Sequence, residues 1–108
     1  MNPVAEHHCV PCHSGGQPLE GKALEKWVRQ LGEGWMVIDG NRLQKEYDFD
    51  DFRQALEFTN RVGAVAEEEG HHPDIYLTYG RATVTLWTHK IGGLHENDFI
   101  MAAKIDCL

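Results

Sequence analysis

Residues 75–90 read IYLTYGRATVTLWTHK, and this stretch decides the fold. Apolar and polar side chains alternate on both sides of Gly80, which is typical of two antiparallel strands joined by a tight turn. With Gly80 and Arg81 as the turn residues, the predicted strands run over 75–79 and 82–90. One side of this hairpin is apolar, so the sequence predicts that it packs against a core.

The same turn predicts which residues face each other across the hairpin. Tyr79 pairs with Ala82 in this register, and continuing it toward the other end places His72 opposite His89. Directly opposed side chains have Cβ atoms about 4.5–5.5 Å apart. We therefore expect His89 to lie at the corner formed by His71 and His72.

Helices and a second pair of strands flank the hairpin. The predicted elements are a helix over 19–31, strands over 35–38 and 42–49, a helix over about 50–69, the hairpin, and a helix over about 96–105. Asp50 and Asp51 suit the N-terminus of the long helix, and Gly70 suits its C-terminus. This order predicts an α+β domain, with a four-stranded antiparallel sheet and helices packed on one face.

Length and composition are those of one domain. The chain has 108 residues, of which 42% are hydrophobic, so one core can form. We expect residues 18–108 to form the domain and residues 1–17 to form a flexible N-terminal arm. No apolar run approaches the ~18 residues of a membrane span, and the first residues lack the pattern of a secretory signal. A cytoplasmic protein is therefore expected.

The net charge argues against one class of partner. Seventeen acidic residues against ten basic ones give a net charge of -7. A surface that binds nucleic acid or an anionic membrane must instead carry basic side chains that neutralise phosphates. We therefore expect no nucleic acid partner and no membrane.

Seven histidines are the unusual feature of the composition. The predicted fold brings His71, His72 and His89 toward one border of the sheet, and Glu67 lies one helical turn before His71. Histidine has an ordinary pKa of ~6.5, so both of its protonation states are available near neutrality. The cluster therefore predicts an acid–base site, whereas the neighbouring glutamates at 68–69 are interpreted as solvent-exposed.

The spacing of these residues resembles the signature of the pterin-4a-carbinolamine dehydratases. In that family a Glu lies four residues before a His-His-Pro triplet, a third His lies eighteen residues after the first, and an Asp lies nine residues beyond it. Glu67, His71-His72-Pro73, His89 and Asp98 match every one of these spacings. The similarity covers roughly residues 18–106, which is essentially the whole predicted domain.

The resemblance implies a fold, an activity and partners. Family members have a four-stranded antiparallel sheet with helices on one face, and they form dimers or tetramers. They dehydrate 4a-hydroxytetrahydropterin to quinonoid dihydropterin, which regenerates the cofactor of aromatic amino acid hydroxylases. The resemblance therefore implies a pterin substrate, a homodimer or homotetramer, and a functional link to such a hydroxylase.

The resemblance also implies a role for each site residue. These roles are proton transfer and substrate contact for His71 and His89, pterin binding for His72, support of the histidines for Glu67 and Asp98, and lining of the pterin pocket for Thr88. The elimination needs only proton transfers, so we expect no cofactor and no catalytic metal ion. Which histidine is the acid and which is the base stays open, because a coupled pair need not titrate as separate sites.

His95 departs from the family pattern. Many relatives have Ser or Thr at this position, where a hydroxyl would cap the last helix with Asp98 at the third helical position. Histidine is not among the preferred N-cap residues. The sequence therefore predicts a weakly capped helix.

Two other classes of function fit parts of the sequence. Some relatives of the dehydratases act as dimerisation cofactors for homeodomain transcription factors, so a protein-binding role is the second interpretation. Cys9-Val-Pro-Cys12-His13 also matches the C-x-x-C-H pattern of haem attachment. The same residues, with His7 or His8, could instead form a weak zinc site. A mobile arm with free thiols is the simplest interpretation of this segment.

Overall fold

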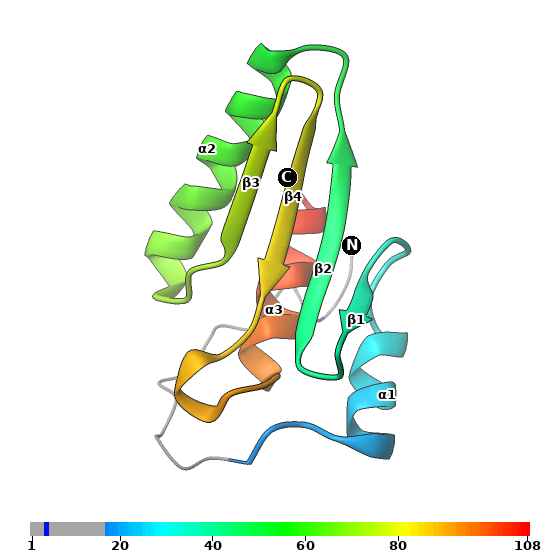
Figure 1. Ribbon diagram of the computed structural model, residues 1–108. Coiled ribbons are helices and arrows are strands. Elements are labelled where there is room, and N and C mark those ends of the chain that lie inside the picture. Colours follow the sequence, from blue (N-terminus) through cyan, green and yellow to red (C-terminus); the bar gives the residue numbers. More distant parts are fainter. Residues whose placement is uncertain (1–3, 5–16) are drawn as a thin grey trace.

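A computed structural model of the chain describes Val4 and residues 17–108. Its elements are α1 (Gly21–Arg29), β1 (Met36–Ile38), β2 (Arg42–Asp48), α2 (Phe52–Glu69), β3 (Asp74–Thr78), β4 (Arg81–Leu86), a short 3-10 helix η2 (His89–Ile91) and α3 (Glu96–Asp106). The strands form one antiparallel sheet in the order β1-β2-β4-β3. Both α2 and α3 lie on the same side of this sheet (Figure 1). The predicted α+β architecture is confirmed.

Residue alternation gives the sheet two different faces. The fully buried side chains are Leu43 of β2 and Ala82, Val84 and Leu86 of β4, which pack against the helices. Their neighbours form the opposite surface, here called the open face, which carries Arg42, Gln44, Tyr76, Thr85 and Trp87 among others. No described helix covers the open face. The helix α3 lies in the core, with Phe99 and Met101 fully buried.

The ends of α2 follow the predicted capping chemistry. The Asp51 side chain accepts a hydrogen bond from the Gln54 N–H at 2.9 Å. Gly70 has a φ of 66°, so the chain leaves the helix directly before His71. The buried face consists of Ala55, Phe58, Val62 and Ala66, whereas Phe52 and Leu56 are exposed. The capping glycine therefore determines where the histidines emerge.

The register of the β3–β4 hairpin differs from the prediction by two residues. Tyr79 and Gly80 form the turn, and Leu77 rather than Tyr79 pairs with Ala82. Gly80 does not have a positive φ. A Cβ atom there would lie 3.1 Å from the carbonyl oxygen of Phe49, so a side chain at this position would be crowded. A shift of two residues keeps the side chains of the paired strands on their predicted faces, but Tyr79 moves into the turn and is 71% exposed.

The shift also changes what faces the histidines. Continuing the observed register places His72 opposite Trp87, so the predicted pairing of His72 with His89 is wrong. The strand β4 ends before Trp87 instead of continuing through residue 90. The reason is local: Thr88 forms a bridge with Gly93, with a 2.8 Å hydrogen bond from the Thr88 N–H. That bridge turns the chain into η2.

A polar cluster accounts for the one charged residue on the apolar side of β2. The Nζ atom of Lys45 lies 2.8 Å from Oδ1 of Asp106, near the end of α3. The same carboxylate accepts hydrogen bonds from the Tyr47 hydroxyl at 2.6 Å and from the Trp35 Nε1–H at 2.9 Å. The cluster therefore fastens the end of α3 to the sheet. Sequence analysis did not find it, because its members are far apart in the chain.

Removal of the Tyr47 hydroxyl should weaken this attachment. Burial, together with donation to Asp106, raises the pKa of Tyr47 above its usual range. The contribution to stability is therefore full below the unfolded pKa of ~10 and is lost as the pH rises above it. We expect Tyr47→Phe to lower the free energy of unfolding by about 1.5–3 kcal/mol and to flatten the alkaline decline. Urea unfolding at several pH values measures the free energy of unfolding and its alkaline decline. Tyr76→Phe is the control, because Tyr76 is exposed. Equal effects of the two substitutions would contradict the role given to the Tyr47 hydroxyl.

Most of the predicted N-terminal arm lies outside the described residues. Val4 is buried and packs against Ile100 and Ala103 of α3. Cys9-Val-Pro-Cys12-His13 lies outside the described residues, so its haem and zinc interpretations stay predictions. Within the described part, no three His, Cys, Asp or Glu side chains are grouped to hold a metal ion.

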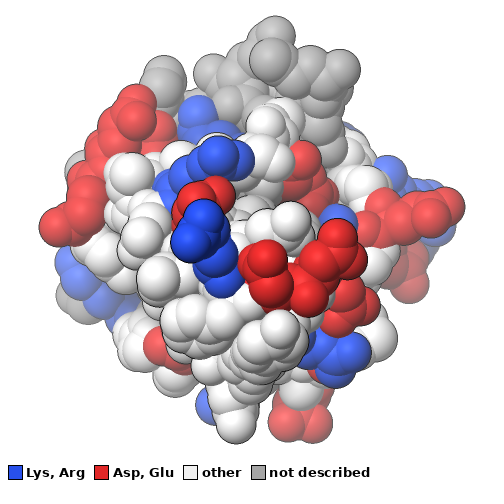
Figure 2. Space-filling view, turned by 90° about the horizontal axis from the view of Figure 1, so that it is seen from above, with Lys and Arg blue, Asp and Glu red and all other residues white. Residues whose placement is uncertain are grey.

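Surface charge and helix hydrophobicity, as far as the structure describes them, are relevant to the expected absence of nucleic acid and membrane partners. Figure 2 shows Lys and Arg side chains interspersed with Asp and Glu over the end of the molecule seen from above. Among the described residues, acidic side chains interrupt the basic ones on that face. None of the described helices is long and apolar enough to cross a membrane.

Candidate active site

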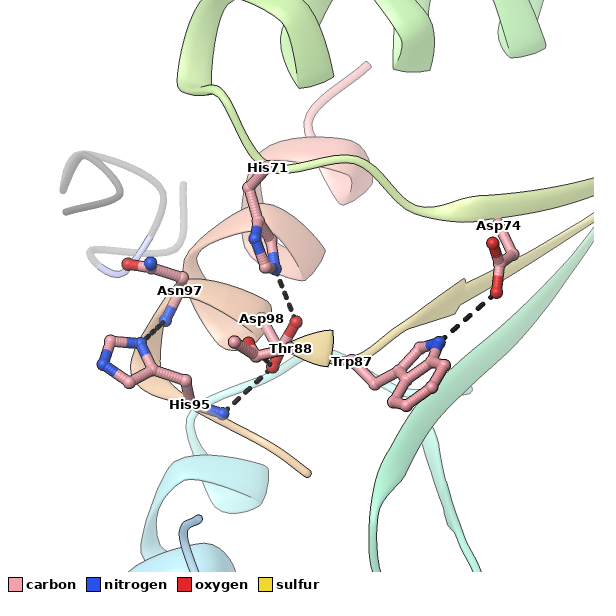
Figure 3. Close-up of polar contacts among 7 residues, drawn as sticks. All are labelled: His71, Asp74, Trp87, Thr88, His95, Asn97 and Asp98. Atoms are coloured by element: carbon pink, nitrogen blue, oxygen red, sulfur yellow. Dashed lines mark hydrogen bonds and ion pairs between the residues drawn. The ribbon is translucent and has the colours of Figure 1, made fainter. Parts of the chain in front are cut away.

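Asp98 is the centre of a polar network at one end of the sheet (Figure 3). Its side chain is fully buried and accepts three hydrogen bonds. Nε2 of His71 lies 2.6 Å from Oδ1, and the Thr88 hydroxyl and the His95 N–H donate to Oδ2 at 2.8 and 3.0 Å. A buried carboxylate is very unfavourable without such donors. The three bonds therefore hold the carboxylate in one position.

The contact with Asp98 determines which nitrogen of His71 can react. An ionised carboxylate only accepts hydrogen bonds, so Nε2 of His71 carries the ring proton and donates a hydrogen bond to Asp98. Nδ1 then has no hydrogen-bond partner among the described residues. The His71 side chain is 12% exposed, and its backbone N–H bonds to the carbonyl of Ala66 at 3.2 Å. The end of α2 and the start of α3 thus fix this imidazole together.

His95 caps α3, which corrects the prediction of a weak cap. Its Nδ1 accepts a hydrogen bond from the Asn97 N–H at 3.0 Å, while Asp98 accepts from the His95 N–H. These reciprocal bonds form a capping box in which an imidazole replaces the usual hydroxyl. The position of Asp98 is therefore fixed by the start of the helix as well as by the site.

Substitution of His95 tests this cap. We expect His95→Ala to lower the free energy of unfolding by about 1 kcal/mol, because the side-chain acceptor is lost. His95→Ser should recover most of that loss, since a hydroxyl can accept the same bond. Urea unfolding of both variants provides the measurement. Equal stability of the two variants would contradict the capping role.

His72 and Glu67 form a separate pair at the surface. The Nε2 and Oε2 atoms are 2.6 Å apart, and the two side chains are 61% and 80% exposed. Pairs as exposed as this contribute only about 0–1 kcal/mol to stability. Among the described residues, no hydrogen bond or ion pair joins this pair to the Asp98 network. Its effect is therefore to orient His72 rather than to hold the fold together.

Glu69 is not solvent-exposed, contrary to the prediction. Its side chain is only 3% exposed, and its Oε2 lies 3.7 Å from Nζ of Lys104 in α3. Glu68 is exposed, as expected. The last turn of α2 is therefore tied to α3 through Glu69, close to the point where His71 leaves the helix.

His89 follows Thr88 directly, but its side chain contacts Trp87 and not Asp98. Its ring stacks on Trp87, with centroids 3.9 Å apart and planes inclined by 30°. Figure 3 shows Thr88 beside Asp98, whereas Trp87 extends to the other side toward Asp74. Among the described residues, no hydrogen bond joins His89 to His71 or His72.

The structure therefore brings only part of the predicted site into direct contact. His71, Thr88 and Asp98 form one network, while His72 and His89 lie in neighbouring contacts of their own. Sequence analysis missed the stack on Trp87. The available signal was a tryptophan two residues before His89, in a strand whose preceding alternate positions are the threonines Thr83 and Thr85.

Comparison with known proteins decides the family. Residues 17–108 match the family model described as pterin 4 alpha carbinolamine dehydratase. The chain belongs to this family. Two relatives provisionally named as pterin-4-alpha-carbinolamine dehydratases agree with it over nearly their whole length. The protein of Rubrobacter xylanophilus is 53% identical over 108 residues, all of both chains. That of Alkaliphilus metalliredigens is 47% identical over 106 residues, or 98% of this chain and 96% of the relative.

Solved structures show the same dehydratase-family fold. The crystal structure of a transcriptional coactivator/pterin dehydratase from Brucella melitensis has a TM-score of 0.78 at 33% identity, over 84% of this chain and 97% of that one. A pterin dehydratase-like protein identified as a RuBisCO assembly factor in the alpha-carboxysome has a TM-score of 0.59 at 25% identity, over 69% and 88%. The family fold is therefore found in proteins described by different roles.

Proposed function

We propose that the chain is a cytoplasmic dehydratase that converts 4a-hydroxytetrahydropterin into quinonoid dihydropterin and water. The observation that carries this proposal is the buried contact between Asp98 and His71, which leaves one imidazole nitrogen available for proton exchange. Membership of the dehydratase family supports the substrate class. The three histidines of the family signature supply the groups that the reaction needs.

The proposed reaction is an elimination with two proton transfers. One proton goes to the hydroxyl on C4a, the C–O bond breaks and water leaves. The proton on N5 is removed, and its electron pair forms the new C=N bond. His71, through Nδ1, and His89 carry out these transfers between them. General acid or base catalysis typically contributes ~10²–10⁴-fold per group, which corresponds to about 3–5 kcal/mol.

The remaining signature residues have supporting roles in this proposal. His72 binds the pterin, and Glu67 orients it through the 2.6 Å contact. Asp98 fixes the tautomer of His71. The Thr88 hydroxyl donates a hydrogen bond to Asp98. We therefore propose that Thr88 supports the carboxylate in addition to lining the pterin pocket.

A stopped-flow assay tests the activity directly. The loss of 4a-hydroxytetrahydropterin is followed with and without the protein, and the rate should rise in proportion to protein concentration. The double variant His71→Ala/His89→Ala is the matched control, because it lacks both proposed acid–base groups. No acceleration by folded wild-type protein would reject the proposed function. Stimulation of an aromatic amino acid hydroxylase in a coupled assay tests the link to cofactor regeneration.

We further propose that the chain forms a homodimer or homotetramer. In the described sheet, β1 and β3 are edge strands with one unpaired side, and such edges invite pairing. Phe52 and Leu56 also expose apolar surface on α2. Sedimentation equilibrium at micromolar concentration should therefore give a mass well above the 12.3 kDa of one chain; a single species of that mass would contradict the proposal.

A protein-binding role is the second candidate function. It is favoured by the descriptions of the two solved relatives as a transcriptional coactivator/pterin dehydratase and as an assembly factor. The open face also presents Tyr76, whose side chain is largely exposed. Stopped-flow assays set beside pull-downs with a defined partner separate the two. A folded protein that binds the partner but leaves the dehydration rate unchanged would favour this second role.

A further inference from the structure

We propose that Trp87 is a positioning residue for His89, and that Asp74 and Arg42 hold the indole in place. In this arrangement each proposed acid–base histidine is oriented by a carboxylate. Asp98 orients His71 directly, and Asp74 orients His89 through Trp87. The inference rests on the proposed function, because His89 is one of the two proposed proton-transfer groups.

The backbone of His89 is fixed, whereas its ring has no hydrogen bond to hold it. Thr88 and Gly93 form a bridge on one side, and the His89 carbonyl accepts from the Gly92 N–H at 3.2 Å. His89 is exposed, and among the described residues neither of its ring nitrogens has a hydrogen-bond partner. His71 differs, because Asp98 holds its Nε2. A restriction on rotation of the His89 side chain would therefore have to come from another contact.

The stack on Trp87 provides that contact. The centroid separation of 3.9 Å and the inclination of 30° place the two rings in a close, tilted stack. Offset-stacked aromatic rings attract each other, and a protonated imidazole is attracted further to the π face of an indole. Contact through the ring face leaves both nitrogens of His89 free to exchange protons. A hydrogen bond would instead occupy one of them.

Trp87 is itself held by residues of the two neighbouring strands. Its Nε1–H donates to Oδ2 of Asp74 in β3 at 3.4 Å, and the guanidinium carbon of Arg42 in β2 lies 4.9 Å from its ring centroid. In the sheet, β4 lies between these two strands. The indole is thus held by contacts from the strands on both sides of β4. It can therefore keep the imidazole of His89 in a narrow range of orientations.

Two substitutions of similar bulk separate stacking from simple packing. Trp87→Leu keeps apolar volume but removes the ring, and Trp87→Phe keeps a ring that can stack. We expect Trp87→Leu to lower kcat about 10-fold with little change in KM. Trp87→Phe can still stack but loses the Nε1–H donated to Asp74, so its kcat should lie between those of Trp87→Leu and wild type. Tyr76→Ala is the matched control, because it removes another aromatic residue of the open face that contacts no histidine among the described residues.

Nuclear magnetic resonance reports on the stack without reference to activity. In wild type the His89 ring protons should be shifted upfield by the indole ring current. Trp87→Leu should lose this shift, and Trp87→Phe should keep part of it. Wild-type protein without dehydratase activity would reject the proposed function, while the resonances would still test the stack. An active wild type whose kcat or His89 resonances do not change in folded Trp87→Leu would overturn the inference.

Discussion

His71→Ala and His89→Ala should each lower turnover by roughly 10²–10⁴-fold, because each removes one of the two proton-transfer groups. Each variant should still bind a pterin analogue, since the loss concerns the reaction rather than recognition. The double variant should lose much less than the product of the two single effects, because groups that act as one unit are not additive. Stopped-flow turnover and analogue titration measure these effects.

The controls for this prediction come from the other histidines. His72→Ala should weaken analogue binding more than it lowers turnover, because His72 is proposed to bind the pterin. His8→Ala and His13→Ala lie outside the family signature and should change neither quantity. Circular dichroism must show that each variant is folded. Near wild-type turnover in both folded His71→Ala and folded His89→Ala would show that the proposed mechanism is wrong.

Asp98→Asn should lower kcat by about 10²–10⁴-fold, by analogy with loss of the orienting carboxylate in a catalytic triad. The amide oxygen can still accept from Thr88 and His95, so the amide N–H₂ group is left to face His71. Nε2 of His71 must then become the acceptor, and its proton moves to Nδ1. Nδ1 of His71, the nitrogen proposed to face the ligand, would thus carry a proton when it should be able to accept one. The ¹⁵N resonances of His71 would report this exchange of tautomers.

Truncation at the same position should affect stability as well. Asp98→Ala leaves three donors without their acceptor, and each buried donor left unsatisfied typically costs about 1–3 kcal/mol. Glu67→Gln is the matched control, because Glu67 also contacts a histidine but is exposed. It should change the free energy of unfolding by less than about 1 kcal/mol. If Asp98→Asn kept wild-type kcat, the tautomer argument would be contradicted.

The features of the fold that could be predicted are those with local causes. Asp51 and Gly70 mark the ends of α2 through capping chemistry that involves only nearby backbone. The two faces of the hairpin follow from alternation along the chain. The exact register does not, because the space at Gly80 is also limited by the approach of Phe49 from another part of the sequence. Sequence analysis could not distinguish such a position from an ordinary turn glycine.

The site shows the same division between local and long-range causes. Family spacing pointed to His71 and Asp98, and the structure places their side chains 2.6 Å apart, while their roles in catalysis stay predictions. The cap by His95 depends on where its Nδ1 points, which no residue pattern reveals. The stack on Trp87 depends on the early end of β4. These contacts could be recognised only once the path of the chain was known.

Asp98 also belongs to two cooperative units at once. It closes the first turn of α3 through the His95 N–H and orients His71 through its other oxygen. Fraying of that turn would release the imidazole, although most of α3 would remain packed in the core. Local opening of this kind has its own free energy, which can be lower than that of global unfolding. Under mild denaturing conditions, reactivity would therefore disappear before the chain unfolds, and the active site would report the integrity of a single helical turn.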